Sequence, residues 1–294
     1  HLEDIHPEDL VVLELSSAQL EDLPRIGWTP PVAVITNLSP HHLDRYGTYA
    51  VYLQAKLNIV PRRGGPQTMV VGDLDGPARE HLGRRFATDR MGMVRAGFPD
   101  PPVALSLPGT FHQRNAACVL AVCAQLGLSE SAVRGALKSF PGLPHRMEPV
   151  RTLRGVTYYN DAKSTAPETT ACALESLERP IIALVGGQAR AGDTPLDRFG
   201  TALSRRCRLV VCLGESGPRF ARAAREAGAR DAGAGKPRAD VEVVGEVGEA
   251  LRLAHHRARP GDSVVFSPGA PSYDAYANFM QRGRQFVEGV RSLV

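Results

Sequence analysis

The amino-acid sequence predicts an α/β protein whose second half is a doubly wound parallel sheet. Short apolar runs alternate regularly with helical patterns after residue 150, an order typical of parallel strands covered by helices on both faces. The segment 140–144, Phe-Pro-Gly-Leu-Pro, is a stiff breaker that separates this half from the first. With 294 residues the chain is long enough for two domains, which we predict at 1–143 and 144–294.

The second half is expected to contain five strands and five helices. The strands are apolar runs near residues 155–160, 181–186, 208–213, 241–244 and 263–267. The helices are expected near 167–178, 196–206, 217–227, 248–258 and 273–292. Ligands of such sheets bind at the carboxyl ends of the strands, so functional residues are expected in the loops that follow them.

The first half has a less regular pattern. Strands are expected at 10–15 and 32–38, and a helix at 48–59 that ends before Pro61. Residues 61–110 predict short strands and loops, followed by helices at 111–127 and 129–140. The chain begins with His1 and almost at once enters a strand, so we expect it to start inside a domain.

Composition and charge limit the classes of function that this protein can have. The net charge is +4 and the arginines are scattered, which suits small phosphorylated or carboxylated ligands better than nucleic acid. The longest apolar runs are far shorter than the roughly 20 residues of a membrane helix. The cysteines form no CxxC pair, and we expect buried thiols. We therefore expect a cytoplasmic, monomeric protein that binds neither membrane nor nucleic acid.

Two residues of the first half suggest a metal site, and a lysine in the expected helix that follows them has an uncertain environment. Glu14 ends an apolar run, and a carboxylate there is either a magnesium ligand or an exposed edge residue. His42 lies in a polar cluster after the second expected strand, which could hold a metal or be a solvated loop. Lys56 lies in an apolar helical stretch, where it is either solvated, as helix lysines usually are, or buried and then modified or in contact with a phosphate.

Two further residues could contact a nucleotide. Asn115 lies on the first turn of an expected helix and could present its amide to a purine, although such residues more often serve the backbone. Arg146 lies beside the breaker segment and could clamp a phosphate, or could pair with Glu148.

The turns after two strands of the second half suggest anion sites. Asp161 could accept hydrogen bonds from a ribose, and Lys163 and Thr165 could bind anions near the helix that follows. Helix capping alone would explain Thr165 but not the whole cluster. Ser272 lies among small residues at the start of the last helix, which suggests a cradle for a substrate carboxylate.

Taken in order, six segments resemble the Mur ligase family over nearly the whole chain. They are LELSS at 13–17, NLSPHHLDR at 37–45, the Asn at 115, LPHRME at 143–148, NDAKST at 160–165 and the stretch 267–283 that ends in Arg-Gly. The first and last are most similar to the members that add D-glutamate. A true phosphate-binding loop is not found, because Asp193 stands where the lysine of such a loop belongs.

The resemblance implies a fold and residue roles. It implies a UDP-binding domain, a central ATPase domain and a Rossmann-like carboxyl-terminal domain, of which this chain would hold part of the second and the whole third. The implied magnesium ligands are Glu14, His42 and Lys56, the last as a carbamate, and the implied catalytic residues are Lys56, His42 and Lys163. The implied nucleotide contacts are Asn115 for adenine, Arg146 for phosphate or ribose and Asp161 for ribose. The implied acceptor-binding residues are Thr165, Arg190, Ser272, Tyr273 and Phe279, with Lys163 beside them.

The implied activity is that of an ATP- and Mg²⁺-dependent ligase. It would join D-glutamate to UDP-N-acetylmuramoyl-L-alanine through an acyl phosphate, in the synthesis of peptidoglycan precursors. This chain alone is then expected not to turn over ATP. The alternatives are another Mur or folylpolyglutamate-synthase-like ligase, a non-catalytic binding module, and a nicotinamide-dependent oxidoreductase. The last is disfavoured because no G-x-G-x-x-G motif follows a strand in this sequence.

Overall fold

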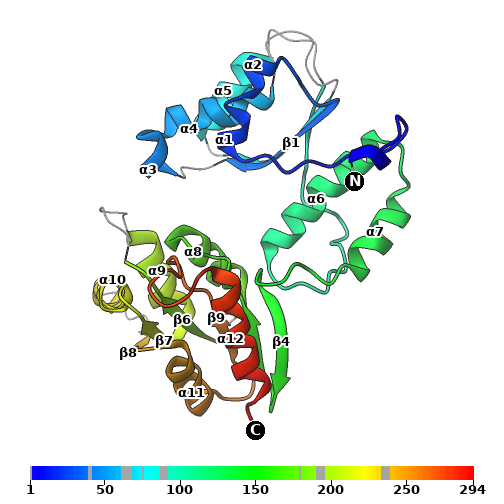
Figure 1. Cartoon of the computed structure of the whole chain (residues 1–294). Coiled ribbons are helices and arrows are strands. Elements are labelled where there is room, and N and C mark those ends of the chain that lie inside the picture. The colour runs from blue at the N-terminus through cyan, green and yellow to red at the C-terminus, as the bar shows by residue number, and fades with distance from the viewer. Residues whose placement is uncertain are drawn as a thin grey trace. The chain divides into compact units, whose positions relative to one another are not determined.

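The structure is a computed structural model that describes residues 2–38, 42–60, 68–74, 76–86, 92–178, 180–189, 196–232 and 239–294 (Figure 1). The chain divides into two compact units, His1–Val103 with Gln113–Leu137, and Ala104–His112 with Lys138–Val294. Among the described residues, no helix combines the length and the apolar character that crossing a membrane requires.

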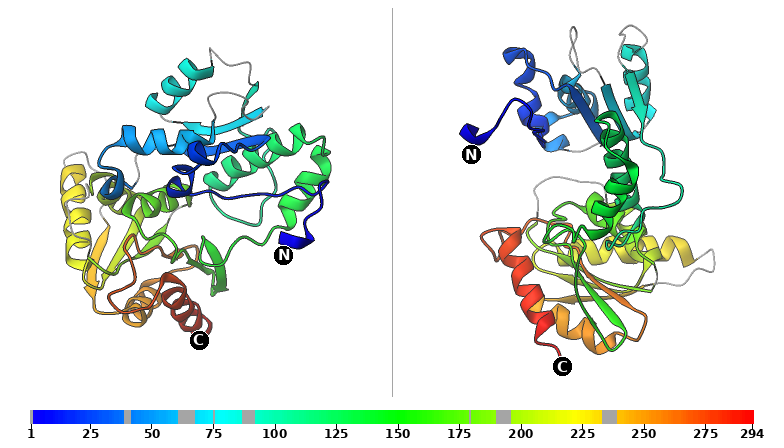
Figure 2. Two further views of the ribbon diagram at one scale, coloured as in Figure 1. Left: turned by 45° about the horizontal axis from the view of Figure 1, so that its top comes forward. Right: turned by 90° about the vertical axis from the view of Figure 1, so that its right-hand side faces the viewer.

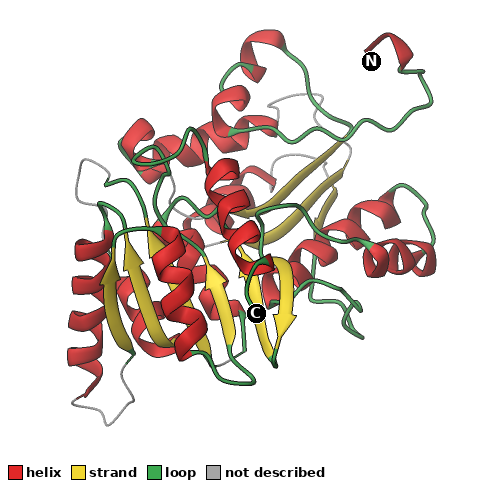
Figure 3. Cartoon of the chain, turned by 60° about the horizontal axis from the view of Figure 1, so that its bottom comes forward, coloured by secondary structure: helices red, strands yellow, loops and turns green. Residues whose placement is uncertain are grey.

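The second unit is built on a six-stranded sheet in the order β4-β5-β9-β6-β7-β8 (Figure 3). The strands are β4 Glu148–Leu153, β5 Val156–Asn160, β6 Ile181–Gly186, β7 Cys207–Leu213, β8 Asp240–Val244 and β9 Ser263–Phe266. All neighbouring pairs are parallel except β4 and β5, which are antiparallel. The predicted α/β class and the predicted parallel strands are confirmed, whereas β4 was not predicted.

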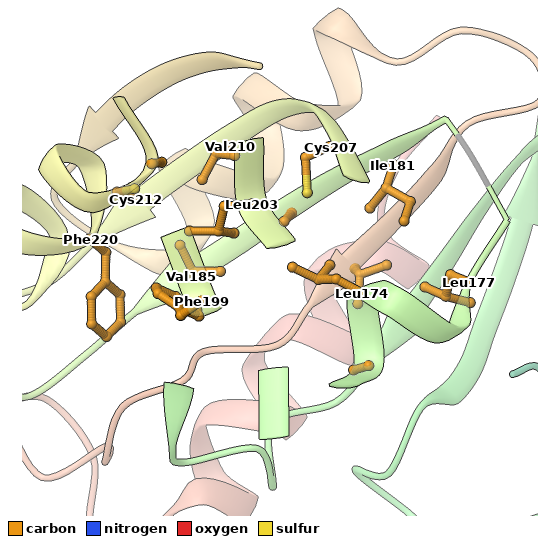
Figure 4. Packing of buried hydrophobic residues seen from close by; sticks show 14 of the residues in the cluster. Leu174, Leu177, Ile181, Val185, Phe199, Leu203, Cys207, Val210, Cys212 and Phe220 are labelled. Carbon is orange, nitrogen blue, oxygen red and sulfur yellow. The ribbon is translucent and has the colours of Figure 1, made fainter. Parts of the chain in front are cut away.

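Helices cover both faces of this sheet (Figures 1 and 2). One apolar cluster joins the sheet to α8 Pro167–Ser176, α9 Asp197–Arg206 and α10 Gly217–Ala232, and a second joins it to α11 Val247–Arg257 and α12 Phe279–Arg291. Alternate residues of β6 enter alternate clusters, because successive side chains of a strand point to opposite faces. Figure 4 shows side chains of the first cluster, among them Val185, Phe199 and Leu203. The central strand is therefore buried on both sides.

The carboxyl end of β6 makes a close backbone approach to β7. Gly186 has φ +130°, a conformation that residues with a side chain rarely adopt. A Cβ atom built on Gly186 would lie 1.9 Å from the carbonyl oxygen of Leu213, the last residue of β7. Only glycine allows the two strand ends to approach in this way.

The first unit contains a three-stranded parallel sheet in the order β1-β2-β3. Its strands are β1 Val32–Leu38, β2 Thr68–Leu74 and β3 Gly92–Arg95. The described helices of this part of the chain are η1 Leu2–Asp4, α1 Ser17–Leu20, α2 Leu23–Ile26, α3 Leu43–Tyr46, α4 Tyr49–Lys56, η2 Leu57–Ile59, α5 Gly76–Phe86, α6 Thr110–Gln125 and α7 Glu130–Ser139. An apolar cluster packs α4, η2 and α5 against the sheet.

Three sequence-based expectations were wrong. Residues 10–15 form no strand and are largely exposed, Val12 to 94%, because no described strand pairs with this apolar run and its backbone groups have no ladder partners. Helix α5 lies where loops and short strands were expected. Cys172 is an exposed thiol, since it lies on the outer side of α8, whereas Cys118, Cys207 and Cys212 are buried as expected.

Candidate functional site

The turn that follows β5 carries a buried carboxylate. Asp161 is 4% exposed and directly follows Asn160, the last residue of β5. Its Oδ1 accepts a hydrogen bond from the backbone N–H of Met147 (3.1 Å), and its Oδ2 accepts one from the hydroxyl of Ser267 (2.7 Å). Burial raises the pKa of Asp161 to about 6, although these hydrogen bonds and the nearby guanidinium of Arg146 oppose the shift. The carboxylate is thus held by residues from distant parts of the chain.

The raised pKa of Asp161 makes the stability of the fold depend on pH. Between the ordinary pKa of 3.8 and about 6, the folded side chain keeps a proton that the unfolded one has released, so the free energy of unfolding falls as the pH rises. In Asp161→Asn the charge is gone, and the hydroxyl of Ser267 can donate to that of Thr170, 3.0 Å away. We expect the variant to exceed the parent in stability by about 3 kcal/mol at pH 7 and by little at pH 4, measured by urea denaturation.

A matched control is Asp240→Asn, which removes an exposed carboxylate at the start of β8. Because this side chain is exposed, the substitution removes one negative charge without removing a buried one. A gain from Asp161→Asn that is equal at both pH values would show that the buried charge is not the cause.

A lysine and two rings lie together beside the same turn. The Nζ atom of Lys163 lies 5.1 Å from the ring centre of Phe279, the first residue of α12. The imidazole of His145 meets that ring edge-on, with the ring centres 5.9 Å apart. Lys163 is exposed, so its ammonium group can bind an anion from solvent while it contacts the ring. The structure therefore brings together Lys163 and Phe279, two residues predicted to lie at the acceptor site.

A buried arginine holds the loop between β9 and α12. Arg282 is 1% exposed and donates hydrogen bonds of 2.9 Å to the carbonyl oxygens of Pro271 and Ala270. Its removal from water lowers the pKa of Arg282 to about 10. The next residues of the loop are Ser272, which is buried, and Tyr273, which is 69% exposed. Ser272 lies in this loop and not at the start of α12 as expected, since that helix begins at Phe279, so the carboxylate cradle stays a prediction without a helix terminus.

The residues predicted to bind the nucleotide are divided between the units. Arg146 is exposed, and its charge lowers the pKa of Asp161, so these two lie within electrostatic reach. Glu148, the alternative partner of Arg146, instead accepts a hydrogen bond from the backbone N–H of His145 (2.9 Å). Asn115 is exposed on α6 in the first unit.

The three predicted metal ligands all belong to the first unit. The ring of His42 lies 6.2 Å from that of Tyr52, which precedes Lys56 by one turn of α4 and shares its face. Glu14 is exposed rather than buried, and its charge acts on Lys56. Burial lowers the pKa of Lys56, and Glu14 partly opposes this. The surroundings of α4 thus hold a carboxylate, an imidazole and a half-buried amine.

These groups can bind a divalent cation only if Lys56 does not carry a positive charge. Carboxylate and imidazole are suitable donors, whereas an ammonium group on Lys56 would repel the cation, so its lowered pKa favours the fit. Among the described residues, no three His, Cys, Asp or Glu side chains form a group suited to a metal ion. A site here would need Lys56 itself as a ligand.

The structure gives less information on the other residues predicted to lie at the site. Arg190 lies outside the described residues. Thr165 is half-buried in the turn before α8. Sequence reasoning assigned no role to His145 or Arg282, although both lie within the motifs of the resemblance; the Arg-Gly end of the last motif was the available signal.

The sequence matches two described protein families. The match to "Mur ligase middle domain" covers residues 3–102, and the match to "Mur ligase, glutamate ligase domain" covers residues 145–269. The first lies within the first unit and the second within the second unit.

Curated relatives match over nearly the whole chain. A UDP-N-acetylmuramoylalanine–D-glutamate ligase of Symbiobacterium thermophilum is 36% identical over 316 residues, which cover 99% of this chain and 66% of the relative. The ligase of the same name from Pelotomaculum thermopropionicum is 32% identical over 309 residues, which cover 98% of this chain and 65% of the relative. The chain therefore spans slightly less than two thirds of the length of these relatives.

Solved structures share the fold at low identity. The MurF ligase of Thermotoga maritima in complex with ADP has a TM-score of 0.63 at 16% identity, with 92% of this chain and 65% of that chain covered. Folylpolyglutamate synthase of Mycobacterium tuberculosis complexed with ADP has a TM-score of 0.62 at 21% identity, with 90% and 64% covered. Identities this low establish the fold alone. Together with the two family matches and the curated relatives, they lead to one conclusion: this chain belongs to the Mur ligase family.

Proposed function

We propose that the chain serves an ATP-dependent ligase reaction that joins D-glutamate to UDP-N-acetylmuramoyl-L-alanine. One observation carries the proposal: a curated ligase named for this reaction is 36% identical over 99% of the chain. The cluster of Lys163 and Phe279 supports it, because an exposed ammonium group beside an apolar ring suits a ligand that carries a carboxylate on a short carbon chain.

The chemistry explains why ATP is required. A carboxylate does not form an amide directly, since oxide is too poor a leaving group. Transfer of the γ-phosphoryl group of ATP to the carboxylate of UDP-N-acetylmuramoyl-L-alanine gives an acyl phosphate and ADP. The amine of D-glutamate then attacks the acyl carbon, loses a proton and expels phosphate. The residues of the chain have to hold these partners in line and bind their negative charges.

The second unit is proposed to bind the acceptor amino acid. Lys163 and Thr165 would contact the acidic acceptor, and Phe279 would limit the space beside it. Ser272 and Tyr273 belong to the loop that Arg282 holds through its two carbonyl contacts. Arg190 is proposed to add a further positive charge.

Nucleotide contacts are proposed for three residues. Arg146 would bind phosphate or ribose, and Asp161 would contact ribose through lone pairs that Met147 and Ser267 leave unused. Asn115 would bind adenine. When bound, magnesium would supply the positive charge that offsets the charge developing on the transferred phosphoryl group.

Lys56 is proposed to hold magnesium together with Glu14 and His42. Burial lowers the pKa of Lys56, which favours the neutral amine. A neutral amine can attack the carbon of CO₂ and lose a proton to give a carbamate, which turns a cation into an anionic oxygen ligand. The half-buried position of Lys56 at the end of α4 supports this role.

We also propose that the predicted domains 1–143 and 144–294 are an ATP-binding domain and an acceptor-binding domain. The cytoplasmic location and the monomeric state stay predictions.

The proposal is tested by supplying different acceptors to the full-length protein. ATP, Mg²⁺ and UDP-N-acetylmuramoyl-L-alanine are held constant, and ADP release is measured with D-glutamate, L-glutamate, D-aspartate, L-lysine and meso-diaminopimelate in turn. We expect kcat/KM for D-glutamate to exceed that for any other acceptor by about 100-fold, because unpaired polar groups in a dedicated site penalise the wrong ligand.

Each other outcome has a clear meaning. A preference for lysine or diaminopimelate would assign the chain to a different ligation step. Release of ADP with L-glutamate only when a folate derivative replaces UDP-N-acetylmuramoyl-L-alanine would favour a folylpolyglutamate-type reaction. No acceptor-dependent ADP release with any of these would favour a non-catalytic binding module.

A further inference from the structure

His145 has an unusual backbone conformation at the centre of the second unit's ligand site. Its φ of +65° lies in the left-handed region, which residues other than glycine adopt uncommonly, and asparagine, aspartate and histidine more often than the rest. Its backbone N–H donates to Oε2 of Glu148 (2.9 Å), and its carbonyl oxygen accepts from the backbone N–H of Lys163 (3.1 Å). The conformation is therefore held at both ends by hydrogen bonds.

The side chain of Asn160 fixes one nitrogen of the His145 ring. The buried Oδ1 of Asn160 accepts from the backbone N–H of Ala162 (3.2 Å), and because a backbone N–H can only donate, the amide orientation is determined. The Nδ2 atom then lies 2.9 Å from Oε2 of Glu148 and 2.8 Å from Nδ1 of His145. Both hydrogens of this amide are thereby used, one for each neighbour.

This arrangement selects one form of the imidazole. Since Nδ2 of Asn160 is a donor, Nδ1 of His145 has to accept, and the ring proton lies on Nε2. The ring has room there only because residue 283 is glycine: a Cβ atom on Gly283 would lie 2.3 Å from Nδ1. Gly283, the glycine that ends the last motif, is therefore needed to leave space for the imidazole ring of His145.

Two functional side chains depend on this residue. The carbonyl of His145 anchors the backbone of Lys163, whose ammonium group lies over Phe279, and the His145 ring meets Phe279 edge-on. Arg146, the next residue along the chain, lies within electrostatic reach of Asp161. One backbone conformation therefore aligns the lysine at the proposed acceptor site with the arginine at the proposed nucleotide site.

We propose that His145 is a positioning residue, held by Asn160 in its Nε2–H form, that aligns Lys163 and Arg146 through its backbone. The part concerning ligation rests on the proposed function, whereas the tautomer and the placement of Lys163 do not. His145 acts through its neighbours and transfers no proton.

The tautomer is tested by long-range ¹H–¹⁵N NMR of the ¹⁵N-labelled 294-residue chain at neutral pH. We expect His145 to show an unprotonated Nδ1 and a protonated Nε2. A protonated Nδ1 would overturn the proposal, whatever reaction the protein catalyses.

The positioning role is tested by exchanging the imidazole for two amides. In His145→Asn, the side-chain oxygen reaches the place of Nδ1, and asparagine tolerates the left-handed backbone. In His145→Gln, the amide reaches the place of Nε2 instead, and the backbone preference is lost.

The ring of Phe279 should shift the Lys163 side-chain protons upfield in the parent and in His145→Asn, and this shift should be lost in His145→Gln. In the full-length enzyme, KM for D-glutamate should stay near the parent value in His145→Asn and rise about tenfold in His145→Gln.

Gly283→Ala provides a further variant, because it leaves every polar partner in place while its Cβ atom would lie 2.3 Å from Nδ1 of His145 and 2.9 Å from Cβ of Ala162, the residue before Lys163. It should lose the upfield shift of Lys163 as His145→Gln does. The reverse order, with His145→Gln retaining the shift and the KM while His145→Asn loses them, would show that Nε2 acts directly and would overturn the proposal. A full-length parent without ligase activity would count against the proposed function, and the NMR results would still decide the role of His145.

Discussion

Gly186→Ala is expected to destabilise the second unit by about 4 kcal/mol or more. The new Cβ atom would lie 1.9 Å from the carbonyl oxygen of Leu213, and the backbone φ of +130° is unsuited to alanine. Relief requires the ends of β6 and β7 to separate, although both strands are buried in the centre of the sheet. Thermal denaturation should show a midpoint lower by about 10 °C or more, or no cooperative transition of this unit.

Gly248→Ala is the matched control, because this glycine lies in α11 with ordinary space for a Cβ atom, 3.4 Å from the nearest neighbour. Alanine favours a helix over glycine, so the midpoint should stay or rise slightly. Equal effects of the two substitutions would contradict the close approach of β6 and β7.

Lys163→Met is expected to lower kcat/KM for D-glutamate by about 10²- to 10³-fold in the full-length protein. The substitution keeps an unbranched side chain that can contact Phe279, but it removes the ammonium group that the proposal places against the acceptor's carboxylate. Loss of one partner of a charge pair in a binding site costs about 2–5 kcal/mol. Steady-state ADP release with varied D-glutamate should show the change, with KM for ATP affected least.

Two further substitutions serve as comparisons for Lys163→Met. Lys163→Arg keeps the charge and changes its geometry, so an intermediate loss is expected. Lys138→Met removes an exposed lysine in the last turn of α7 and should leave the kinetics unchanged. An unchanged KM for D-glutamate in Lys163→Met would remove this lysine from the acceptor site.

The second half of the fold was accessible from the sequence because its strands are unambiguous. Residues 181–186 and 207–213 are nearly continuous apolar runs, as expected for strands buried on both faces, and small residues or turns separate them from the helices. The strand β4 was not predicted, because its residues Glu148–Leu153 are half-buried or exposed and include Pro149. An edge strand leaves a weak periodic signal.

The secondary structure of the first half was harder to predict, because whether a segment there forms a strand depends on the segments that lie beside it in the fold. Residues 10–15 have the apolar character of a strand, yet a strand also needs a partner to satisfy its backbone, and the described part of the chain provides none. Helix α5 contains two glycines, a proline and three arginines, a composition that does not distinguish a helix from a loop. Local composition could not reveal either outcome.

The site could be predicted in part only. Asp161 and Lys163 were predicted as site residues because they lie in the turn after an expected strand, whereas Phe279 was predicted only from the resemblance of its segment to the Mur ligase family. The contribution of His145 could not be found, because it arises from the pairing of β4 with β5 and from the approach of Gly283 on α12, more than 130 residues away. Contacts between distant segments leave no local periodicity.

The strand order of the second unit has a consequence for biosynthesis. The last strand, β9, lies between β5 and β6, so a nascent chain without Ser263–Phe266 has an open gap in the middle of its sheet. Until those residues leave the ribosome, β5 and β6 present unpaired backbone edges that invite pairing with other chains. Completion of this unit therefore has to wait for β9, and chains released before it are expected to be substrates for chaperones and proteases.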